Sequence, residues 1–297
     1  MVIVQIHSGL GNQMFQYAAG RALAAKLGTS LKLDLTWFEK SASAQTPNDY
    51  QLNLFPGIKE EFASKREIDD LIRPSSEGIL NRLKHKLNRS KPVHKRWAFV
   101  EPQFHFYSDF FKASNPVYLS GYWQSEKYFG SISDEIRNIF SLDIPLDDDA
   151  RKYLIQILQT NAVSLHVRRG DMVNNPLVVA THGSCNLDYY LSSMALIERK
   201  VENPHFYIFS DDVKWCEENL KSKHPITFVQ GNSGERAYLD IQLMRNCSHH
   251  IIANSSFSWW GAWLNNSQNK VVVAPVKWFA TDEKDTRDLI PPDWKRI

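Results

Sequence analysis

Arginine, histidine and acidic side chains follow an apolar run in the middle of the chain. Ala162 to Val167 alternates as a buried strand does, and His166, Arg168, Arg169 and Asp171 lie at its carboxyl end or just beyond it. Guanidinium groups bind phosphate oxygens in a bidentate way, and a carboxylate can orient an arginine or take a proton. Because neighbours on a strand point to opposite faces, we expect only one arginine to meet a ligand. A salt-bridged strand end explains the same residues equally well.

Polar residues of the same kind follow two further predicted strands. Ser210 and Asp211 come directly after Phe206 to Phe209, and Asn254-Ser255-Ser256-Phe257-Ser258 follows His250 to Ala253. Small hydroxyl side chains and free amides at a helix amino terminus suit a phosphate, although the serines also serve as helix caps. Since parallel strands end at one edge of a sheet, we expect the three strand ends to line one nucleotide pocket.

Asp240 lies in a predicted helix beside apolar positions such as Ile241 and Met244. Its carboxylate is either an ordinary exposed group or an acceptor for the N1 and N2 groups of guanine. No grouping of His, Asp or Glu has the spacing of a metal site, and arginine stands where a metal would otherwise neutralise a diphosphate. The simplest hypothesis is a metal-free enzyme that uses a sugar nucleotide.

A glycine-containing turn opens the chain. It joins a predicted strand, Val2 to Ile6, to a predicted helix, Gln13 to Leu27, and it contains Gly9, Gly11 and Asn12. With Asp34 in the next strand, the turn imitates a dinucleotide fingerprint, but Met14 stands where a third glycine allows close helix packing. The alternatives are a turn whose amides and side chains approach another ligand, and a plain connection.

The remaining apolar runs alternate between the periods of strands and helices. Strands are predicted over Leu31–Leu35, Val117–Tyr122, Ile226–Val229 and Val271–Ala274, and helices up to Phe140 and over Asp149–Gln159, Leu187–Val201, Val213–Lys221 and Glu235–Asn246. This alternation predicts an α/β fold with parallel sheets. Proline and a break in the pattern between Ser141 and Asp149 indicate two domains, 1–145 and 146–297.

The composition is that of an ordinary globular enzyme. The chain has 297 residues, 43% of them hydrophobic and 23% charged, and its net charge of +2 gives no case for nucleic acid as a partner. Three widely spaced cysteines indicate neither a disulfide framework nor a cysteine-rich metal site. The apolar start, Met1 to Ile6, is too short for a signal peptide or membrane anchor. These features predict a cytoplasmic protein.

The segment from Arg82 to Arg96 is strongly basic. It contains seven Lys or Arg residues and no Asp or Glu. Such a segment can contact an anionic membrane surface or lie near a lipid-linked substrate, and it can equally be a solvated helix. Peripheral contact with the inner membrane is therefore one of two expectations.

Three motifs together resemble the bacterial α-1,2-fucosyltransferases, glycosyltransferase family 11. They are His166-Val-Arg168-Arg169-Gly-Asp171, Gly9-Leu-Gly11-Asn12-Gln13-Met-Phe-Gln-Tyr, and Asn254-Ser-Ser-Phe-Ser-Trp-Trp-Gly-Ala-Trp-Leu264. His182-Gly183, Tyr189-Tyr190 and Trp278-Phe279 are similar as well, so the likeness spans nearly the whole chain.

The resemblance implies a GT-B fold, in which two Rossmann-like domains face a central cleft. It implies GDP-fucose bound mainly by the second domain, acceptor contacts mainly in the first, and inverting transfer of fucose to the 2-hydroxyl of a galactoside without a cofactor or metal. The expected acceptor is a galactose-terminated oligosaccharide, lipid-linked or free, in surface polysaccharide synthesis such as that of O-antigen.

The same resemblance assigns roles to individual residues. Arg168 is expected to contact the diphosphate. Separately from the resemblance, the acceptor hydroxyl needs a carboxylate or imidazole to take its proton, and Asp171 and His182 are the candidates. The expected donor-binding set is Gly9, Gly11, Asn12, Gln13, His166, Arg168, Ser210, Asp211, Asp240, Asn254, Ser255, Ser256 and Phe257. Two other classes stay open: an NAD-dependent oxidoreductase that uses Gly9, Gly11 and Asp34, and a non-catalytic glycan-binding relative.

Overall fold

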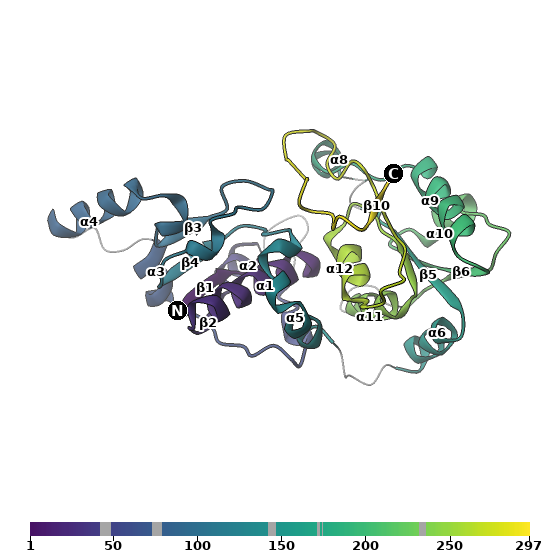
Figure 1. Ribbon diagram of the computed structural model, residues 1–297, viewed down its shortest axis with the longest axis horizontal. Coiled ribbons are helices and arrows are strands. Elements are labelled where there is room, and N and C mark those ends of the chain that lie inside the picture. Colours follow the sequence, from purple (N-terminus) through teal and green to yellow (C-terminus); the bar gives the residue numbers. More distant parts are fainter. Residues whose placement is uncertain (42–48, 73–78, 142–146, 171–172, 174, 232–235) are drawn as a thin grey trace. The chain divides into compact units, whose positions relative to one another are not determined.

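The chain forms two compact α/β units (Figure 1). The computed structural model describes residues 1–41, 49–72, 79–141, 147–170, 173, 175–231 and 236–297. Unit 1 comprises Met1–Ser141 and Asp285–Leu289, and unit 2 comprises Leu142–Lys284 and Ile290–Ile297.

Unit 1 is built on four parallel strands in the order β2-β1-β4-β3. The strands are β1 (Val2–Gln5), β2 (Leu31–Asp34), β3 (Ala98–Val100) and β4 (Val117–Ser120). Helix α1 (Leu10–Leu27) follows β1 and lies close to the sheet: a Cβ on Gly20 would come within 3.1 Å of Val4. Gly28 ends α1 with a left-handed φ of 59°, a conformation that glycine adopts without strain.

The other helices of unit 1 are short. They are α2 (Thr36–Ser41), α3 (Lys65–Ile72), α4 (Ile79–Ser90) and α5 (Ser133–Ile139), with 3-10 helices that include η4 (Glu126–Tyr128) and η5 (Gly130–Ile132). Beside β3 and β4, four buried aromatic rings pack edge to face or tilted, with centroids 4.7–5.9 Å apart: Phe99, Phe110, Trp123 and Tyr128. Aromatic burial on this scale dominates the local core.

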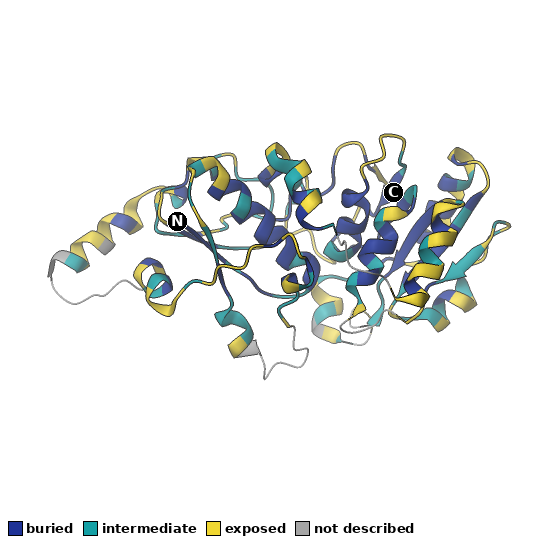
Figure 2. Cartoon of the chain, turned by 90° about the horizontal axis from the view of Figure 1, so that it is seen from below, coloured by how far each residue is buried: buried dark blue, intermediate teal, exposed yellow. Residues whose placement is uncertain are grey.

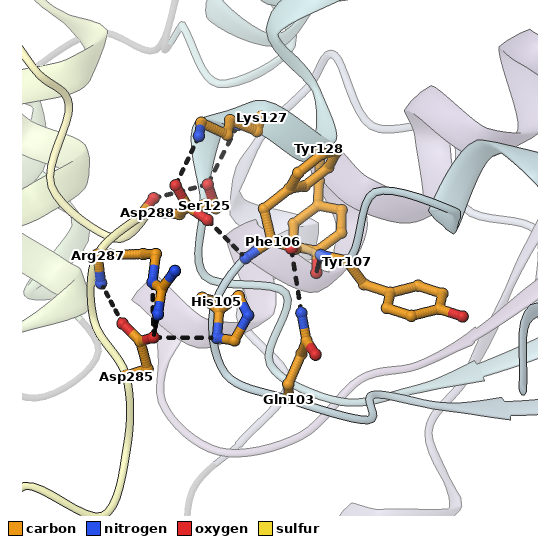
Figure 3. A network of polar contacts seen from close by, with 10 residues as sticks. All are labelled: Gln103, His105, Phe106, Tyr107, Ser125, Lys127, Tyr128, Asp285, Arg287 and Asp288. Atoms are coloured by element: carbon orange, nitrogen blue, oxygen red, sulfur yellow. Dashed lines mark hydrogen bonds and ion pairs between the residues drawn. The ribbon is translucent and has the colours of Figure 1, made fainter.

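A short segment near the end of the chain, Asp285–Leu289, belongs to unit 1 and is held there by polar contacts (Figure 3). The Asp288 carboxylate accepts a hydrogen bond from the Phe106 amide at 3.1 Å and pairs with Lys127 Nζ at 2.5 Å. Its carbonyl accepts from Ser125 Oγ at 2.6 Å. The chain therefore passes between the units three times.

Unit 2 contains six parallel strands in the order β10-β9-β8-β5-β6-β7. They are β5 (Asn161–Val167), β6 (Pro204–Ser210), β7 (Ile226–Phe228), β8 (His249–Ile251), β9 (Val272–Ala274) and β10 (Lys295–Arg296). The helices are α6 (Asp148–Leu158), α8 (Pro176–Thr181), α9 (Leu187–Lys200), α10 (Val213–Asn219), α11 (Tyr238–Asn246) and α12 (Ser256–Leu264).

The core of unit 2 follows the alternation of its central strand. Val163, Leu165 and Val167 of β5 are fully buried in a cluster that includes Tyr190 and Ile197 of α9. Figure 2 shows the same contrast across the fold, with buried strands and helices exposed on their outer sides. The three cysteines are buried and unpaired.

Helices α11 and α12 pack closely because of one glycine. A Cβ on Gly261 would come within 2.8 Å of the Met244 Cβ, so only glycine permits this approach without displacement. Trp259, Trp260 and Trp263 of α12 are buried in the core. Within the described residues, no helix is both long and apolar enough to span a membrane.

The two parallel sheets confirm the predicted α/β class with two Rossmann-like domains. Three local expectations differ from the structure. Helix α1 begins at Leu10, the helix expected up to Phe140 is η4, η5 and α5 in succession, and the two short strands β3 and β10 were not predicted.

Candidate functional site

The three polar strand ends of unit 2 lie on neighbouring strands. In the sheet, β5 pairs with β8 on one side and β6 on the other, and Val167 lies opposite Ser210. The structure thus brings His166, Arg168, Ser210, Asp211 and the turn before α12 to one carboxyl edge, where open α/β sheets bind ligands.

Arg169 is tied into the body of unit 2. Its Nε donates to Asp212 at 3.1 Å, and its guanidinium carbon lies 4.1 Å from the centre of the Trp215 ring. The side chain is thus held by an ion pair and a cation–π contact with residues that follow β6. These contacts fit the expectation that one arginine of the pair is structural.

Arg168 comes two residues after His166, directly beyond the end of β5, and is half-exposed. Its Nε lies 3.4 Å from Asp211 Oδ2, while Asp211 Oδ1 accepts from the Arg169 amide at 2.8 Å. Gly170 leaves room for this carboxylate, since a Cβ there would lie 2.9 Å from Asp211 Oδ2. Asp211 therefore orients the turn that carries Arg168, and its direct contact with the donor stays a prediction.

His166 lies under the same edge. The residue is only 6% exposed, and its ring centroid is 5.7 Å from that of Phe257. Burial, assisted by the positive charge of Arg168, lowers the pKa of His166 to about 3. The imidazole is therefore neutral near pH 7. Its Nδ1 finds no hydrogen-bond partner among the described residues, so a ligand could supply one.

The amino terminus of α12 is free of side-chain capping. Ser255 occupies the N-cap position with φ −138°, but its side chain makes no capping bond, so the expectation that a serine caps this helix is wrong for Ser255. Ser256 and Phe257 are half-exposed in the first turn. The first amides of α12 are thus left to meet an anion beside His166.

Asn254 supports this turn from below. The residue is buried, and its Nδ2 lies 3.1 Å from both the His182 and Gly183 carbonyls and 3.2 Å from that of Trp278. Its Oδ1 accepts from the Cys185 thiol. Because both ends of the amide are used internally, Asn254 positions the segment with His182 rather than contacting a ligand with its side chain.

The remaining candidates of unit 2 have distinct positions. His182 is half-buried with its ring 5.5 Å from Phe279, and Ser210 Oγ accepts from the Asp212 amide at 2.9 Å. Asp240 lies in the first turn of α11, one turn before Met244, just as Phe257 lies one turn before Gly261. Helices α11 and α12 each follow a strand, so both begin on the side of the sheet where the strands end. Asp240 and Phe257, near the beginnings of these two helices, therefore lie at a similar height above the sheet edge. Asp171 lies outside the described residues.

The opening turn of unit 1 differs from a glycine loop. Ser8, not a glycine, has the positive φ of 64°, whereas Gly9 is extended as the residue before α1. Gln13 is buried and bonds the Ser8 and Asp49 carbonyls, each at 2.8 Å. Asn12 accepts from Gln124 at 2.6 Å, and Gly11 is buried. The Gln13 side chain was expected to contact the donor, but it is buried and holds the Ser8 and Asp49 segments together.

Asp34 does not provide the carboxylate of a dinucleotide site. It is 1% exposed, and its two oxygens accept from the Thr36 amide at 2.9 Å and the Tyr118 hydroxyl at 2.6 Å. A ribose would have to displace one of these buried bonds. The NAD interpretation therefore loses its acidic residue.

Unit 1 has an aromatic group that the sequence reading did not single out. His7, Trp37 and Tyr122 follow β1, β2 and β4, and the His7 ring lies 6.0 Å from Trp37 and 4.9 Å from Tyr122. Tyr122 is 37% exposed. The signal was present, since each residue comes within three positions of the end of a predicted parallel strand.

Glu101 holds the turn that carries Tyr122. Its carboxylate accepts from the amides of Tyr122 at 2.7 Å and Trp123 at 3.0 Å, and Trp123 has a positive φ of 56°. A Cβ on Gly121 would lie 2.4 Å from the Glu101 Cβ, so glycine is required beside this carboxylate. Among the described residues, no three His, Cys, Asp or Glu side chains are grouped to hold a metal ion.

Comparison with known proteins identifies the family. Residues 95–297 match the sequence model of glycosyl transferase family 11. The chain is 35% identical to an alpha-1,2-colitosyltransferase of Escherichia coli over 100% of this chain and 99% of that protein. It is also 35% identical to the O-antigen biosynthesis glycosyltransferase WbnK of Escherichia coli, covering 94% and 95%.

A third relative matches over a shorter range. Galactoside 2-alpha-L-fucosyltransferase SEC1 of Bos taurus is 30% identical over 50% of this chain and 42% of its own length. Two full-length matches and a family match over most of the chain leave one conclusion. This chain belongs to glycosyltransferase family 11.

Proposed function

We propose that the protein transfers fucose from GDP-β-L-fucose to the 2-hydroxyl of a galactoside, with inversion, forming an α-1,2 linkage. The observation that carries the proposal is a group of residues at the carboxyl edge of unit 2 that suits an anion. His166 is in β5 and Arg168 follows directly after the strand, and the His166 ring centroid lies 5.7 Å from that of Phe257 in the uncapped first turn of α12. The name of the bovine relative supports fucose and a galactoside as substrates.

The chemistry needs positive charge at this place. Breaking the bond between fucose C1 and the phosphate oxygen leaves negative charge on GDP, while the sugar gains oxocarbenium character. A guanidinium and helix amides stabilise that developing charge without a metal. Asp211 keeps Arg168 oriented through its 3.4 Å contact, so less reorganisation is needed when the diphosphate binds.

The nucleoside part of the donor is assigned to the neighbouring residues. A neutral His166 offers one donor and one acceptor nitrogen, which suits a hydroxyl or phosphate oxygen better than a second positive charge would. Asp240, level with Phe257 in the first turn of α11, is assigned to the guanine N1 and N2 groups.

The galactoside is assigned to the aromatic group of unit 1. Pyranose rings have an apolar face that packs on aromatic rings, and Trp37 and exposed Tyr122 provide such rings beside His7. The proton of the attacking 2-hydroxyl is assigned to Asp171 or His182, since a carboxylate or imidazole is the usual acceptor.

A second donor is favoured by one observation, the full-length match to a colitosyltransferase. Colitose lacks the hydroxyl at C3 of fucose, so GDP-colitose would occupy the same diphosphate site. A site that forms a hydrogen bond with the C3 hydroxyl of fucose discriminates strongly against colitose. A site with an apolar contact at C3 favours colitose over fucose only modestly.

The test is transfer by the full chain with GDP-fucose or GDP-colitose and a panel of β-galactosides, followed by linkage analysis. We expect a fucosylated product substituted at galactose O2, formed equally with and without EDTA. If only GDP-colitose gives a product, GDP-colitose replaces GDP-fucose as the proposed donor, and the proposed diphosphate site stays the same. A different linkage, no transfer from either donor, or strict dependence on Mg²⁺ or Mn²⁺ would contradict the proposal.

A further inference from the structure

Helix α4 carries an apolar strip that is exposed in the part of unit 1 that the structure describes. Leu83 and Leu87, one turn apart, are 53% and 58% exposed. Side chains four residues apart lie on one helix face, so the two leucines form a continuous strip. In Figure 1, α4 lies beyond α3 and β3 at the margin of unit 1, and most of its described residues have the colour of exposed residues in Figure 2.

The body of unit 1 contacts a different side of the helix. Asn88 is buried, and its Oδ1 accepts from the Trp97 amide at 3.3 Å. Asn81, two turns earlier, is half-buried on the same side. At about 100° per residue, both leucines lie well away from the two asparagines, so their side chains face outward.

Basic side chains flank the strip on both sides. Lys84 lies along one edge and Lys86 along the other, with Arg89 farther round beyond Lys86, and all three are exposed. The sequence has no Asp or Glu between Ile79 and Val100. The arrangement is therefore an apolar strip between two positive borders.

We propose that α4 docks unit 1 on an anionic membrane surface, lying in the plane of the interface. Leu83 and Leu87 would enter the boundary between headgroups and acyl chains, while Lys84, Lys86 and Arg89 meet lipid phosphates. An anionic bilayer offers both an apolar layer and a plane of negative charge. The charged backbone of a nucleic acid duplex offers no apolar layer of this kind and would leave the leucines in water. The proposal does not depend on which sugar is transferred.

The test is sedimentation of the full chain with phosphatidylcholine vesicles, with and without added phosphatidylglycerol. We expect binding only with phosphatidylglycerol, weakened by NaCl because counterions screen the lysines. The double variant L83S/L87S and the triple variant K84Q/K86Q/R89Q should each lower partitioning on the order of a hundredfold.

Matched controls are Leu158→Ser, an exposed leucine of α6, and K200Q/K214Q/K223Q, three exposed lysines of unit 2. Both should bind vesicles like the original chain, and all variants should keep its melting temperature since only exposed side chains change. Equal binding to neutral vesicles, unchanged binding by L83S/L87S, or binding of a single-stranded DNA oligonucleotide in place of vesicles would overturn the proposal.

Discussion

Arg168 and Arg169 are neighbours in the chain with different contacts, and we propose different roles for them. We expect Arg168→Ala to lower kcat by about a hundred- to thousand-fold, because it removes one positioned charge from the leaving diphosphate. Arg169→Ala should instead lower the free energy of unfolding by about 1–2 kcal/mol, through loss of the Asp212 bond and the Trp215 contact.

Steady-state kinetics and urea unfolding of both variants check this contrast. Arg168→Lys is the conservative comparison, because it keeps the charge but loses the planar fork. Near-normal turnover in Arg168→Ala, or a larger loss of kcat in Arg169→Ala, would contradict the assignment.

Buried His166 makes stability depend on pH. Its pKa is lowered from 6.5 to about 3, chiefly by burial, so between these values the unfolded chain takes a proton that the folded chain does not. The contribution of His166 to the free energy of unfolding is fully present above pH 6.5. It is lost as the pH falls toward 3, and the free energy of unfolding then decreases by about 1.4 kcal/mol per pH unit.

Unfolding of His166→Gln across pH 4 to 6 isolates this slope. In the variant, the free energy of unfolding should change less steeply with pH, by the amount that corresponds to about one proton taken up on unfolding. This difference in slope does not depend on the stability of the variant at about pH 7. His250, which is also buried with a lowered pKa, contributes equally to both proteins. Parallel profiles would show that His166 is not the group responsible.

At the scale of single residues, the sequence predicts orientation better than role. The two-residue period of β5 predicts that Arg168 and Arg169 face opposite ways. Which of them is structural depends on Asp212 and Trp215, which follow another strand. The internal hydrogen bonds of Asn254 could not be predicted for the same reason, since its partners at His182 and Trp278 are remote in sequence.

Turns after strands decide how unit 1 presents its aromatic side chains. Glu101→Ala removes the acceptor of two amides and frees the turn in which Trp123 has a positive φ. We expect KM for the galactoside to rise about tenfold or more, since the cost of a lost bond to a charged acceptor is about 1.5–3 kcal/mol. KM for the nucleotide sugar should not change.

Glu101→Gln keeps one acceptor oxygen and should give an intermediate KM for the galactoside. Glu61→Ala, an exposed acidic residue of the same unit, is the matched control and should behave like the original chain. If both KM values rise together in Glu101→Ala, the aromatic group does not act on the acceptor.

At the scale of elements, long alternating runs were predictable and short pieces were not. The central strands β5 and β6 and helix α9 match their predicted ranges to within two residues. Strand β3 has only three residues and follows a basic segment, so no period marks it. Its place depends on pairing with β4, a contact that local sequence does not encode.

At the scale of the whole molecule, the chain returns once to its first unit. Asp285–Leu289 lies in the range that the sequence assigns to the second domain, yet it forms part of unit 1. Five residues have no helix or strand period, so nothing in the sequence marks the return. Polar contacts hold the segment in unit 1, and the Asp288 carboxylate makes two of them, with the Phe106 amide and Lys127 (Figure 3).

Replacing Asp288 should make the segment Asp285–Leu289 less firmly bound to unit 1, without unfolding either unit. Asp288→Ala removes two charge-assisted bonds, those to the Phe106 amide and Lys127, and leaves the carbonyl bond from Ser125. Amide hydrogen exchange in residues 286–289 and at Phe106 should accelerate on the order of thirtyfold, since the bond to the Phe106 amide is worth about 1.5–3 kcal/mol and the exposed Lys127 pair adds little. Exchange in α12 should be unchanged, as it should be throughout in Asp293→Ala, an exposed aspartate of unit 2. Unaltered exchange at 286–289 would mean that Asp288 does not hold the segment.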